Sequence, residues 1–189
     1  MGCKLHELVS LVRGNTYKSK LLGNNGPALL GLGTITRNGG FNNSKLRYYP
    51  GETSEKILMH PGDLYVSLKD ITNKGDLLGA VARVPDTVPL GRLTQDTVAL
   101  RFHQGVSTDY QQYVYWSLRT PQYRSYCKAR GMGTTNLSLS RDDFLSWELP
   151  NYSYERKTLV ELFEEIEKLI SNLVQANGHL YSSELVLAA

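Results

Sequence analysis

The sequence predicts an α+β fold, in which a curved, mostly antiparallel sheet with short helices precedes a long C-terminal coiled-coil helix. Short apolar and β-branched runs separated by Gly- and Asp-rich turns fill positions 58–102, which is typical of antiparallel strands. From Asp109 onward the large side chains follow helical spacing instead. Beyond position 154 apolar residues recur every seventh position, which predicts a coiled-coil seam. A chain of 189 residues with 41% apolar residues suffices for one domain and an appended helix.

The first part of the chain is expected to supply the strands. Residues 3–12 alternate loosely and predict a first strand or a short helix, and further strands are predicted at 28–35, 64–68, 77–84 and 98–102. The run at 64–68 is β-branched and aromatic enough to be a central strand. Gly79 is expected where a neighbouring element comes close to the backbone.

Helices are expected after Asp109. Positions 110–118 have helical spacing, and Thr120-Pro121 combines a capping residue with a first-turn proline, opening a second helix that runs to Arg130. A strand at 137–139 then precedes Ser140 and Asp143, which have the spacing of a capping pair over a short helix. A last strand at 147–150 leads to the long helix.

The long helix is predicted at 154–176, with Ser153 as its cap and Asn177-Gly178 as its stop. It would span roughly 35 Å at 1.5 Å per residue. Its apolar stripe packs either on its own domain or against a second helix in an intermolecular or interdomain seam. For the second arrangement we expect homodimerisation through Leu159, Leu162, Phe163, Ile166, Leu169, Ile170 and Leu173, with Leu180 continuing the repeat.

Charge is unevenly distributed along the chain. Positions 151–189 hold three Lys or Arg and six Asp or Glu residues; because the whole chain carries +3, positions 1–150 carry +6. No acidic residue occurs between Asp109 and Asp142, whereas this interval contains Arg124, Lys128 and Arg130 interleaved with tyrosines. Such a stripe predicts contacts to a phosphate backbone; the alternative is a core-facing aromatic row with solvated cations.

Polar loops at strand ends are candidates for reading a ligand. Loops held on a rigid sheet often carry recognition, although Asp, Asn and Thr also form ordinary turns. The candidate DNA-binding residues are Arg47, Tyr48, Lys69, Asp70, Thr72, Asn73, Lys74, Thr134, Thr135 and Asn136, together with Arg124, Lys128 and Arg130 of the basic stripe.

Several classes of chemistry are not predicted. The glycine-rich run at 31–33 lacks a third glycine and a following helix, so no dinucleotide site is expected. The four histidines show no metal-ligand spacing, and neither a nucleophile elbow nor a methyltransferase motif occurs. We therefore expect no catalysis, cofactor or metal. Two distant cysteines and the absence of a long apolar run predict a cytoplasmic protein with reduced thiols and no membrane span.

The order of several short segments resembles one known family. These segments are Gly62-Asp63-Leu64-Tyr65-Val66-Ser67, Thr94-Gln95-Asp96, the aromatic helix pair, Gly131 to Asn136, Leu139-Ser140, and Leu149-Pro150 before a long helix. Together they resemble the specificity subunit of type I restriction-modification systems, over nearly the whole chain. The Pro-rich segment with Glu-Gln that family members often have at the helix start is replaced here by residues 151–156.

The resemblance implies a DNA target recognition domain at 1–150 and a conserved helical spacer and dimerisation region at 151–189. Most members carry two such halves in tandem, and this chain resembles one half. The implied partners are double-stranded DNA, methyltransferase subunits and, where present, an endonuclease subunit. The chain would then be a non-catalytic specificity subunit that dimerises to read a bipartite target. The alternative is a self-associating adaptor or a regulatory or antiphage DNA-binding protein that acts without a methyltransferase.

Overall fold

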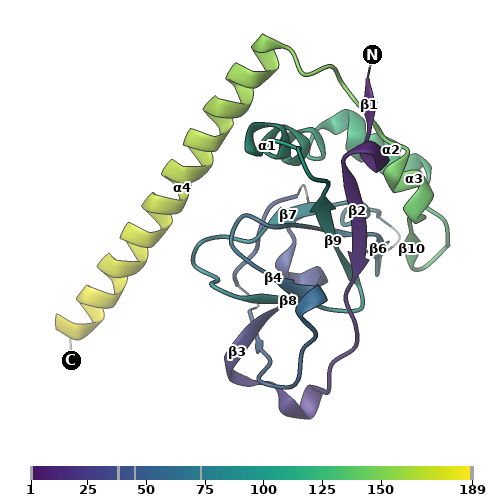
Figure 1. Ribbon diagram of the computed structural model, residues 1–189. Coiled ribbons are helices and arrows are strands. Elements are labelled where there is room, and N and C mark those ends of the chain that lie inside the picture. The colour runs from purple at the N-terminus through teal and green to yellow at the C-terminus, as the bar shows by residue number, and fades with distance from the viewer. Residues whose placement is uncertain (1, 38, 45, 73, 188–189) are drawn as a thin grey trace. The chain divides into compact units, whose positions relative to one another are not determined.

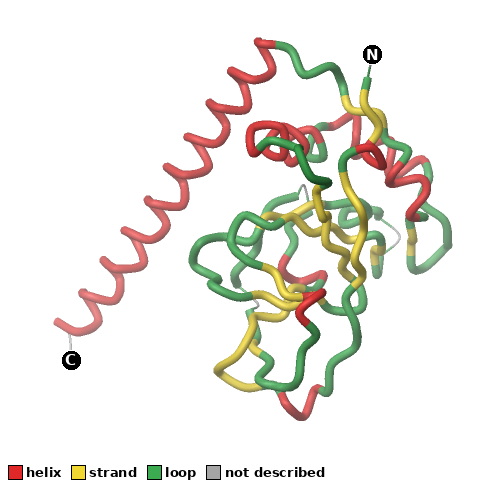
Figure 2. Tube along the Cα trace, viewed as in Figure 1, coloured by secondary structure: helices red, strands yellow, loops and turns green. Residues whose placement is uncertain are grey.

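The computed structural model describes residues 2–37, 39–44, 46–72 and 74–187, with side chains up to position 177. The chain divides into two compact units, Met1–Asn151 and Tyr152–Ala189. The first unit contains all the strands and three short helices, and long loops connect them (Figure 2). The second unit consists of one helix. The α+β class with short helices and mainly antiparallel strand pairs is as the sequence predicts.

A four-stranded antiparallel sheet forms the centre of the first unit (Figure 1). Its order is β2 (Val9–Arg13), β9 (Thr97–Phe102), β5 (Leu64–Ser67) and β7 (Val81–Arg83). β5 pairs with both β9 and β7, and all four of its residues are buried, which confirms the predicted central strand. All of β5 and the first four residues of β9 are buried, so this sheet gives the loops at its ends a rigid base.

A second sheet was not expected from the sequence. It has three strands in the order β3 (Gly23–Leu30), β8 (Gly91–Leu93) and β4 (Leu58–Met59), and β3 runs parallel to β8. The prediction of one curved sheet is therefore wrong in detail. The sequence did not indicate β8, because this strand is only three residues long and follows Pro89 and Leu90 without an alternating pattern of its own. Both sheets contribute to one core, which includes Leu30, Met59, Tyr65, Leu93 and Ala99.

The helices begin where the sequence indicates. These are α1 (Thr108–Ser117), α2 (Pro121–Ala129) and α3 (Arg141–Leu145), and the serine or threonine preceding each accepts a hydrogen bond from a backbone N–H of the first turn. Gly79, at φ +70°, lies against α2: a Cβ there would be 2.4 Å from Cys127 Sγ. This confirms the expected close approach. Short 3₁₀ helices occur at η1 (Leu5–Glu7), η2 (Ser19–Leu21), η3 (Leu32–Thr34) and η4 (Glu55–Ile57).

Two short strand pairs join distant parts of the first unit. β1 (Cys3–Lys4) pairs antiparallel with β11 (Glu148–Leu149). β6 (Lys69–Asp70) pairs antiparallel with β10 (Leu137–Ser138). The second pair fixes the position of one polar loop against another.

The second unit is α4 (Tyr154–Leu187), a helix of 34 residues. Its first turn is capped as predicted, since Arg156 N donates to Ser153 Oγ at 3.4 Å. The predicted stop at Asn177-Gly178 is wrong, because the helix continues through both residues. An interior glycine costs only about 1 kcal/mol relative to alanine, which helix-forming neighbours on both sides can offset. The coiled coil remains a prediction, as do the roles assigned to residues 1–150 and 151–189.

Candidate nucleic-acid interface

The pairing of β6 with β10 brings together two of the loops that the sequence selected. Leu137 lies opposite Asp70, and Ser138 lies opposite Lys69. Met132 extends the arrangement by exchanging backbone hydrogen bonds of 2.8 Å with Ser138 in both directions. We call residues 69–76 and 131–138 the paired loops. Candidate residues that are more than 60 positions apart in the sequence thus share one surface.

Asp70 holds the first of the paired loops from inside. It is 1% exposed. Its Oδ1 accepts hydrogen bonds from Thr72 N at 2.8 Å and Thr72 Oγ1 at 2.9 Å, and its Oδ2 accepts from Leu77 N at 2.9 Å. Burial alone would raise the pKa of Asp70, but these hydrogen bonds outweigh it and lower the pKa below the ordinary value. The carboxylate therefore shapes the loop, and we do not propose that it contacts DNA.

Arg124 also has a structural role that the sequence did not predict. Its Nη1 donates to Leu78 O at 2.6 Å, and its Nη2 donates to Asp76 O at 2.8 Å and to Gly75 O at 3.3 Å. The guanidinium on α2 thereby fixes the backbone at the end of the first paired loop. We therefore do not propose that the Arg124 side chain contacts DNA.

Three other cations beside the paired loops, Lys69, Lys128 and Arg130, have acidic neighbours. Lys69 Nζ lies 3.4 Å from Asp96 Oδ1, and Lys128 Nζ lies 3.2 Å from Asp76 Oδ1. Arg130 Nε lies 3.7 Å from Asp143 Oδ1, and its guanidinium stacks 3.8 Å above the Tyr126 ring. These side chains are 44–48% exposed, so solvent weakens the pairs, and a phosphate can compete for the cations.

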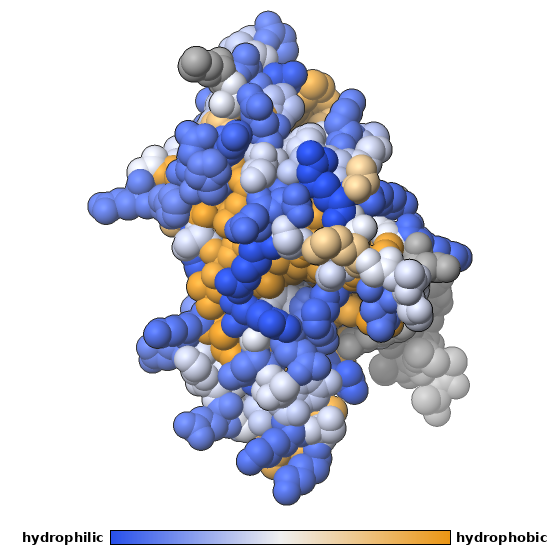
Figure 3. Space-filling view, turned by 90° about the vertical axis from the view of Figure 1, so that its right-hand side faces the viewer, coloured by the Kyte–Doolittle hydropathy of each residue, from blue (hydrophilic) through white to orange (hydrophobic). Residues whose placement is uncertain are grey.

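The paired loops direct a mixed set of side chains to solvent. Ile71 and Met132 are 67% and 58% exposed, although sequence reasoning selected neither. Figure 3 draws the side of the molecule on which β6, β10 and α3 are labelled in Figure 1. On this side, hydrophilic side chains surround a strip of apolar surface. Asn73 lies outside the described residues. The exposed candidates of the paired loops are Lys69, Thr72, Lys74, Thr134, Thr135 and Asn136.

Arg47 and Tyr48 lie beside β3 of the three-stranded sheet. The backbone of this segment pairs with β3, since Leu29 N donates to Arg47 O at 2.8 Å and Tyr48 forms a bridge with Ala28. Both side chains are exposed, and Arg47 Nη2 donates to Tyr17 Oη at 3.5 Å. The structure therefore separates these two candidates from the paired loops.

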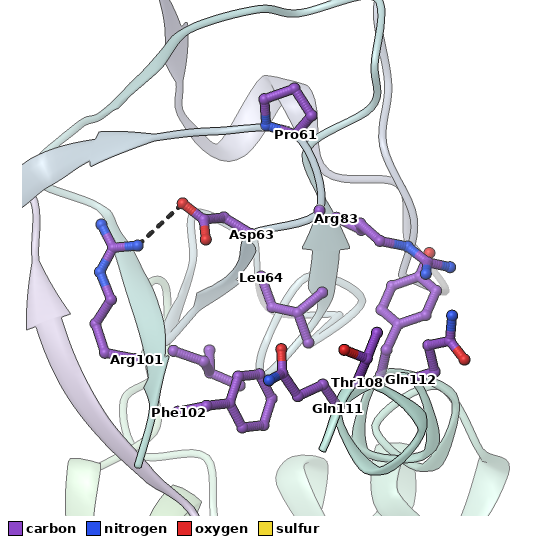
Figure 4. A pocket seen from close by; sticks show the side chains of 12 residues that line it. Pro61, Asp63, Leu64, Arg83, Arg101, Phe102, Thr108, Gln111 and Gln112 are labelled. Carbon is purple, nitrogen blue, oxygen red and sulfur yellow. Dashed lines mark hydrogen bonds and ion pairs between the residues drawn. The ribbon is translucent and has the colours of Figure 1, made fainter. Parts of the chain in front are cut away.

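A pocket of about 460 Å³ lies between α1 and the four-stranded sheet (Figure 4). Its one carboxylate among the described lining residues, Asp63, is held by Arg101 Nη1 at 3.0 Å and by His60 N at 2.9 Å. The Arg83 guanidinium lies 4.3 Å from the centre of the Tyr115 ring. No histidine or cysteine occurs among these lining residues. The Gly62-Asp63 motif thus has a structural explanation as an anchored turn.

Other reactive groups do not form a second site. Cys127 is fully buried, and desolvation raises its pKa to about 11, which keeps it a neutral thiol. No cluster of three metal-ligating side chains occurs in the described part of the chain. In the same residues, no helix is both long and apolar enough to cross a membrane.

The seven seam residues of α4 are all exposed, from 39% for Phe163 to 57% for Leu169. Val174, at 58%, adds to the same group. Because side chains three and four positions apart lie on one helical face, these residues form a continuous apolar stripe. The stripe exceeds the scattered apolar exposure that is ordinary for a soluble surface.

Comparison with solved structures identifies the fold. No family model and no curated protein sequence matches the chain. The structure is similar to the S subunit of a type I restriction-modification system from M. genitalium, with a TM-score of 0.65 and 16% identity. It is also similar to a chain of a type I restriction-modification complex, at 0.59 and 15%, and to the HsdS subunit from Thermoanaerobacter tengcongensis, at 0.55 and 14%.

Each alignment covers 93% of this chain but only 39–41% of the matched chain. The match therefore includes almost everything present here and less than half of each solved protein. The chain has the fold of the specificity subunit of type I restriction-modification systems.

Proposed function

We propose that this protein acts as a sequence-specific DNA-binding specificity subunit of a type I restriction-modification system. Its globular unit reads one part of a bipartite DNA target, and two copies joined through α4 read the whole target. Methyltransferase subunits, and endonuclease subunits where the system has them, are then directed to that target. The subunit itself is not catalytic. The observation that carries the proposal is the fold match, which spans 93% of this chain but about two fifths of the solved chains.

The paired loops support DNA reading by the globular unit. The buried Asp70 carboxylate and the Arg124 guanidinium hold the backbone of the first loop, and the pairing of β6 with β10 holds the second against it, so the exposed side chains need little further ordering when DNA binds. Thr72, Thr134 and Asn136 offer donors and acceptors for base edges. Lys128 and Arg130 lie at the border of this surface and remain candidates for phosphate contacts.

The helix supports the two-copy arrangement. Its apolar stripe is exposed over at least four turns, and its seven-residue repeat is that of a two-stranded coiled coil. A second copy supplies an identical stripe and also the second recognition unit that a bipartite target requires. Two identical units related by a two-fold axis read the same sequence on opposite strands, so the target is an interrupted palindrome.

Co-expression with a methyltransferase subunit of a type I system, followed by mapping of methylated positions, tests the proposal. We expect the two proteins to co-purify and to methylate an interrupted palindrome. Exchange of residues 69–74 for the corresponding loop of a second specificity subunit should change the sequence of both half-sites together. A matched exchange of the exposed turn at 103–106 should leave the target unchanged.

Three outcomes would contradict parts of the proposal. A continuous or asymmetric target would exclude the two-copy model. A target unaffected by the 69–74 exchange would remove the paired loops from base reading. A purified chain that binds DNA but neither co-purifies with nor directs a methyltransferase would favour a free-standing DNA-binding protein.

A further inference from the structure

Arg92 is a buried cation whose partners are all neutral. It lies on β8 and is 2% exposed. Its guanidinium donates to Thr53 Oγ1 at 3.2 Å, to Leu93 O at 3.4 Å, to Thr16 O at 2.9 Å and to Asn15 Oδ1. No carboxylate is among the partners of Arg92 in the described part of the chain.

This arrangement leaves positive charge uncompensated beneath the surface. Hydrogen bonds to neutral acceptors satisfy the N–H groups but do not cancel the charge, and a buried charge interacts more strongly with a nearby counter-ion than a solvated one does. Arg101 differs from Arg92 because it faces the Asp63 carboxylate at 3.0 Å. The surroundings of Arg92 are therefore attractive to an anion from outside the protein.

A row of aromatic rings connects Arg92 to the surface. Its guanidinium lies 4.8 Å from the centre of the Tyr49 ring, and the Tyr49 ring meets the Tyr17 ring edge-on at 6.0 Å. The Tyr17 hydroxyl in turn accepts a hydrogen bond from Arg47 Nη2 at 3.5 Å. Arg47 keeps further N–H groups for another acceptor, because the guanidinium has five donors in all.

Two more cations follow Tyr17 in the sequence. Lys18 and Lys20 are exposed, and the structure gives neither of them an acidic partner among the described residues. In this they resemble Lys74 of the paired loops and differ from Lys69, Lys128 and Arg130, each of which has an acidic neighbour. We call Tyr17, Lys18, Lys20, Arg47 and Arg92 the Tyr17 cluster.

We propose that the Tyr17 cluster binds the phosphate backbone of a DNA duplex. This inference rests on the proposed function. Lys18, Lys20 and Arg47 donate to phosphodiester oxygens, and the buried Arg92 charge strengthens the local positive potential. The cluster positions the duplex without distinguishing bases, because phosphate contacts carry no direct sequence information.

The salt dependence of DNA binding by the full chain tests the proposal. The triple variant Lys18→Gln, Lys20→Gln, Arg47→Gln removes three exposed positive charges and leaves Arg92 and its hydrogen bonds in place. A control variant with the same net charge carries Lys4→Gln, Arg37→Gln and Lys168→Gln, all at exposed positions. Binding of a fluorescent duplex would be measured by anisotropy at several salt concentrations, and circular dichroism would verify that both variants are folded.

We expect the cluster variant to bind at least tenfold more weakly near 0.15 M salt, with a salt slope lower by about 2–3 units, because each lost phosphate contact lowers it by about 0.9. The control variant should keep the wild-type slope to within about one unit. Replacing single phosphates by neutral methylphosphonates should locate the contact, since the phosphates that the cluster binds should weaken wild-type binding when replaced but have no effect on the cluster variant, whereas phosphates bound elsewhere should weaken both.

The outcomes distinguish this inference from the proposed function. A wild-type chain that binds DNA while the cluster variant keeps its salt slope, or while the control variant loses as much, would overturn the inference alone. A wild-type chain that binds no DNA, either alone or with a methyltransferase subunit, would overturn both.

Discussion

Replacement of Asp70 by asparagine should destabilise the globular unit by about 2–4 kcal/mol at neutral pH. The carboxylate accepts hydrogen bonds from Thr72 and from Leu77 N, and hydrogen bonds to a charged acceptor contribute about 1.5–3 kcal/mol each. Asparagine keeps one oxygen but turns an NH₂ group toward a backbone N–H, so at least one buried donor loses its acceptor. Urea unfolding followed by the fluorescence of Trp116 and Trp147, both in this unit, measures the loss.

The pH dependence gives a second test of the same carboxylate. The pKa of Asp70 is lower in the folded state than in the unfolded chain, where an Asp side chain has a pKa of about 3.9. The ionised group therefore contributes stability above about pH 3.9, and this contribution is lost as pH falls through the pKa of Asp70 in the folded state. The difference between wild type and Asp70→Asn should therefore be full at pH 7 and shrink below about pH 4. Asp86→Asn, at an exposed position, is the control. If both variants unfold within about 0.5 kcal/mol of each other at pH 7, the anchoring role of Asp70 is wrong.

Three further predictions concern other elements. Gly79→Ala should lower the free energy of unfolding by more than about 3 kcal/mol, because Gly79 has φ +70° and the new Cβ would lie 2.4 Å from Cys127 Sγ. Gly105→Ala, at φ +92° with nothing within 4 Å of the new Cβ, should cost only about 1–2 kcal/mol of backbone strain. Similar losses for the two variants would contradict the packing argument. Ile166→Asp with Leu169→Asp should convert a dimer to a monomer in light scattering at micromolar concentration, since each buried seam side chain contributes roughly 1.5–3 kcal/mol; a monomeric wild type would exclude the dimer. Arg124→Met should lower the free energy of unfolding by about 2–4 kcal/mol while changing the salt slope of DNA binding little, and the reverse pattern would return this arginine to the phosphate contacts.

Local signals in the sequence were sufficient for the starts of the helices. Thr120-Pro121 and the Ser140–Asp143 pair act within one turn, so their hydrogen bonds depend on few other parts of the chain. The central strand β5 was also predictable, because four consecutive buried residues require an apolar and β-branched composition. By contrast, β6 and β10 are two residues each, and their pairing is decided by the packing of segments far apart in sequence.

The candidate site shows the same division. The paired loops could be selected by composition, but their contact with each other could not. The basic stripe was read from an interval without acidic residues, yet the fold brings Asp76 and Asp143 beside Lys128 and Arg130. The charge of a sequence segment is therefore a poor guide to the charge of the surface it forms. Arg92 was missed because a lone arginine in a short apolar strand gives no sign of which neutral groups will surround it.

The pairing of β1 with β11 has a consequence for exchange by recombination. Cys3 lies opposite Leu149, so the chain enters and leaves the globular unit on two hydrogen-bonded neighbouring strands. A block whose two junctions are adjacent can be replaced by a different block of the same kind without altering the separation of the flanking segments. Under the proposed function, new target specificities would therefore arise by replacement of residues between these two strands as a single cassette, with the sequence of α4 inherited unchanged.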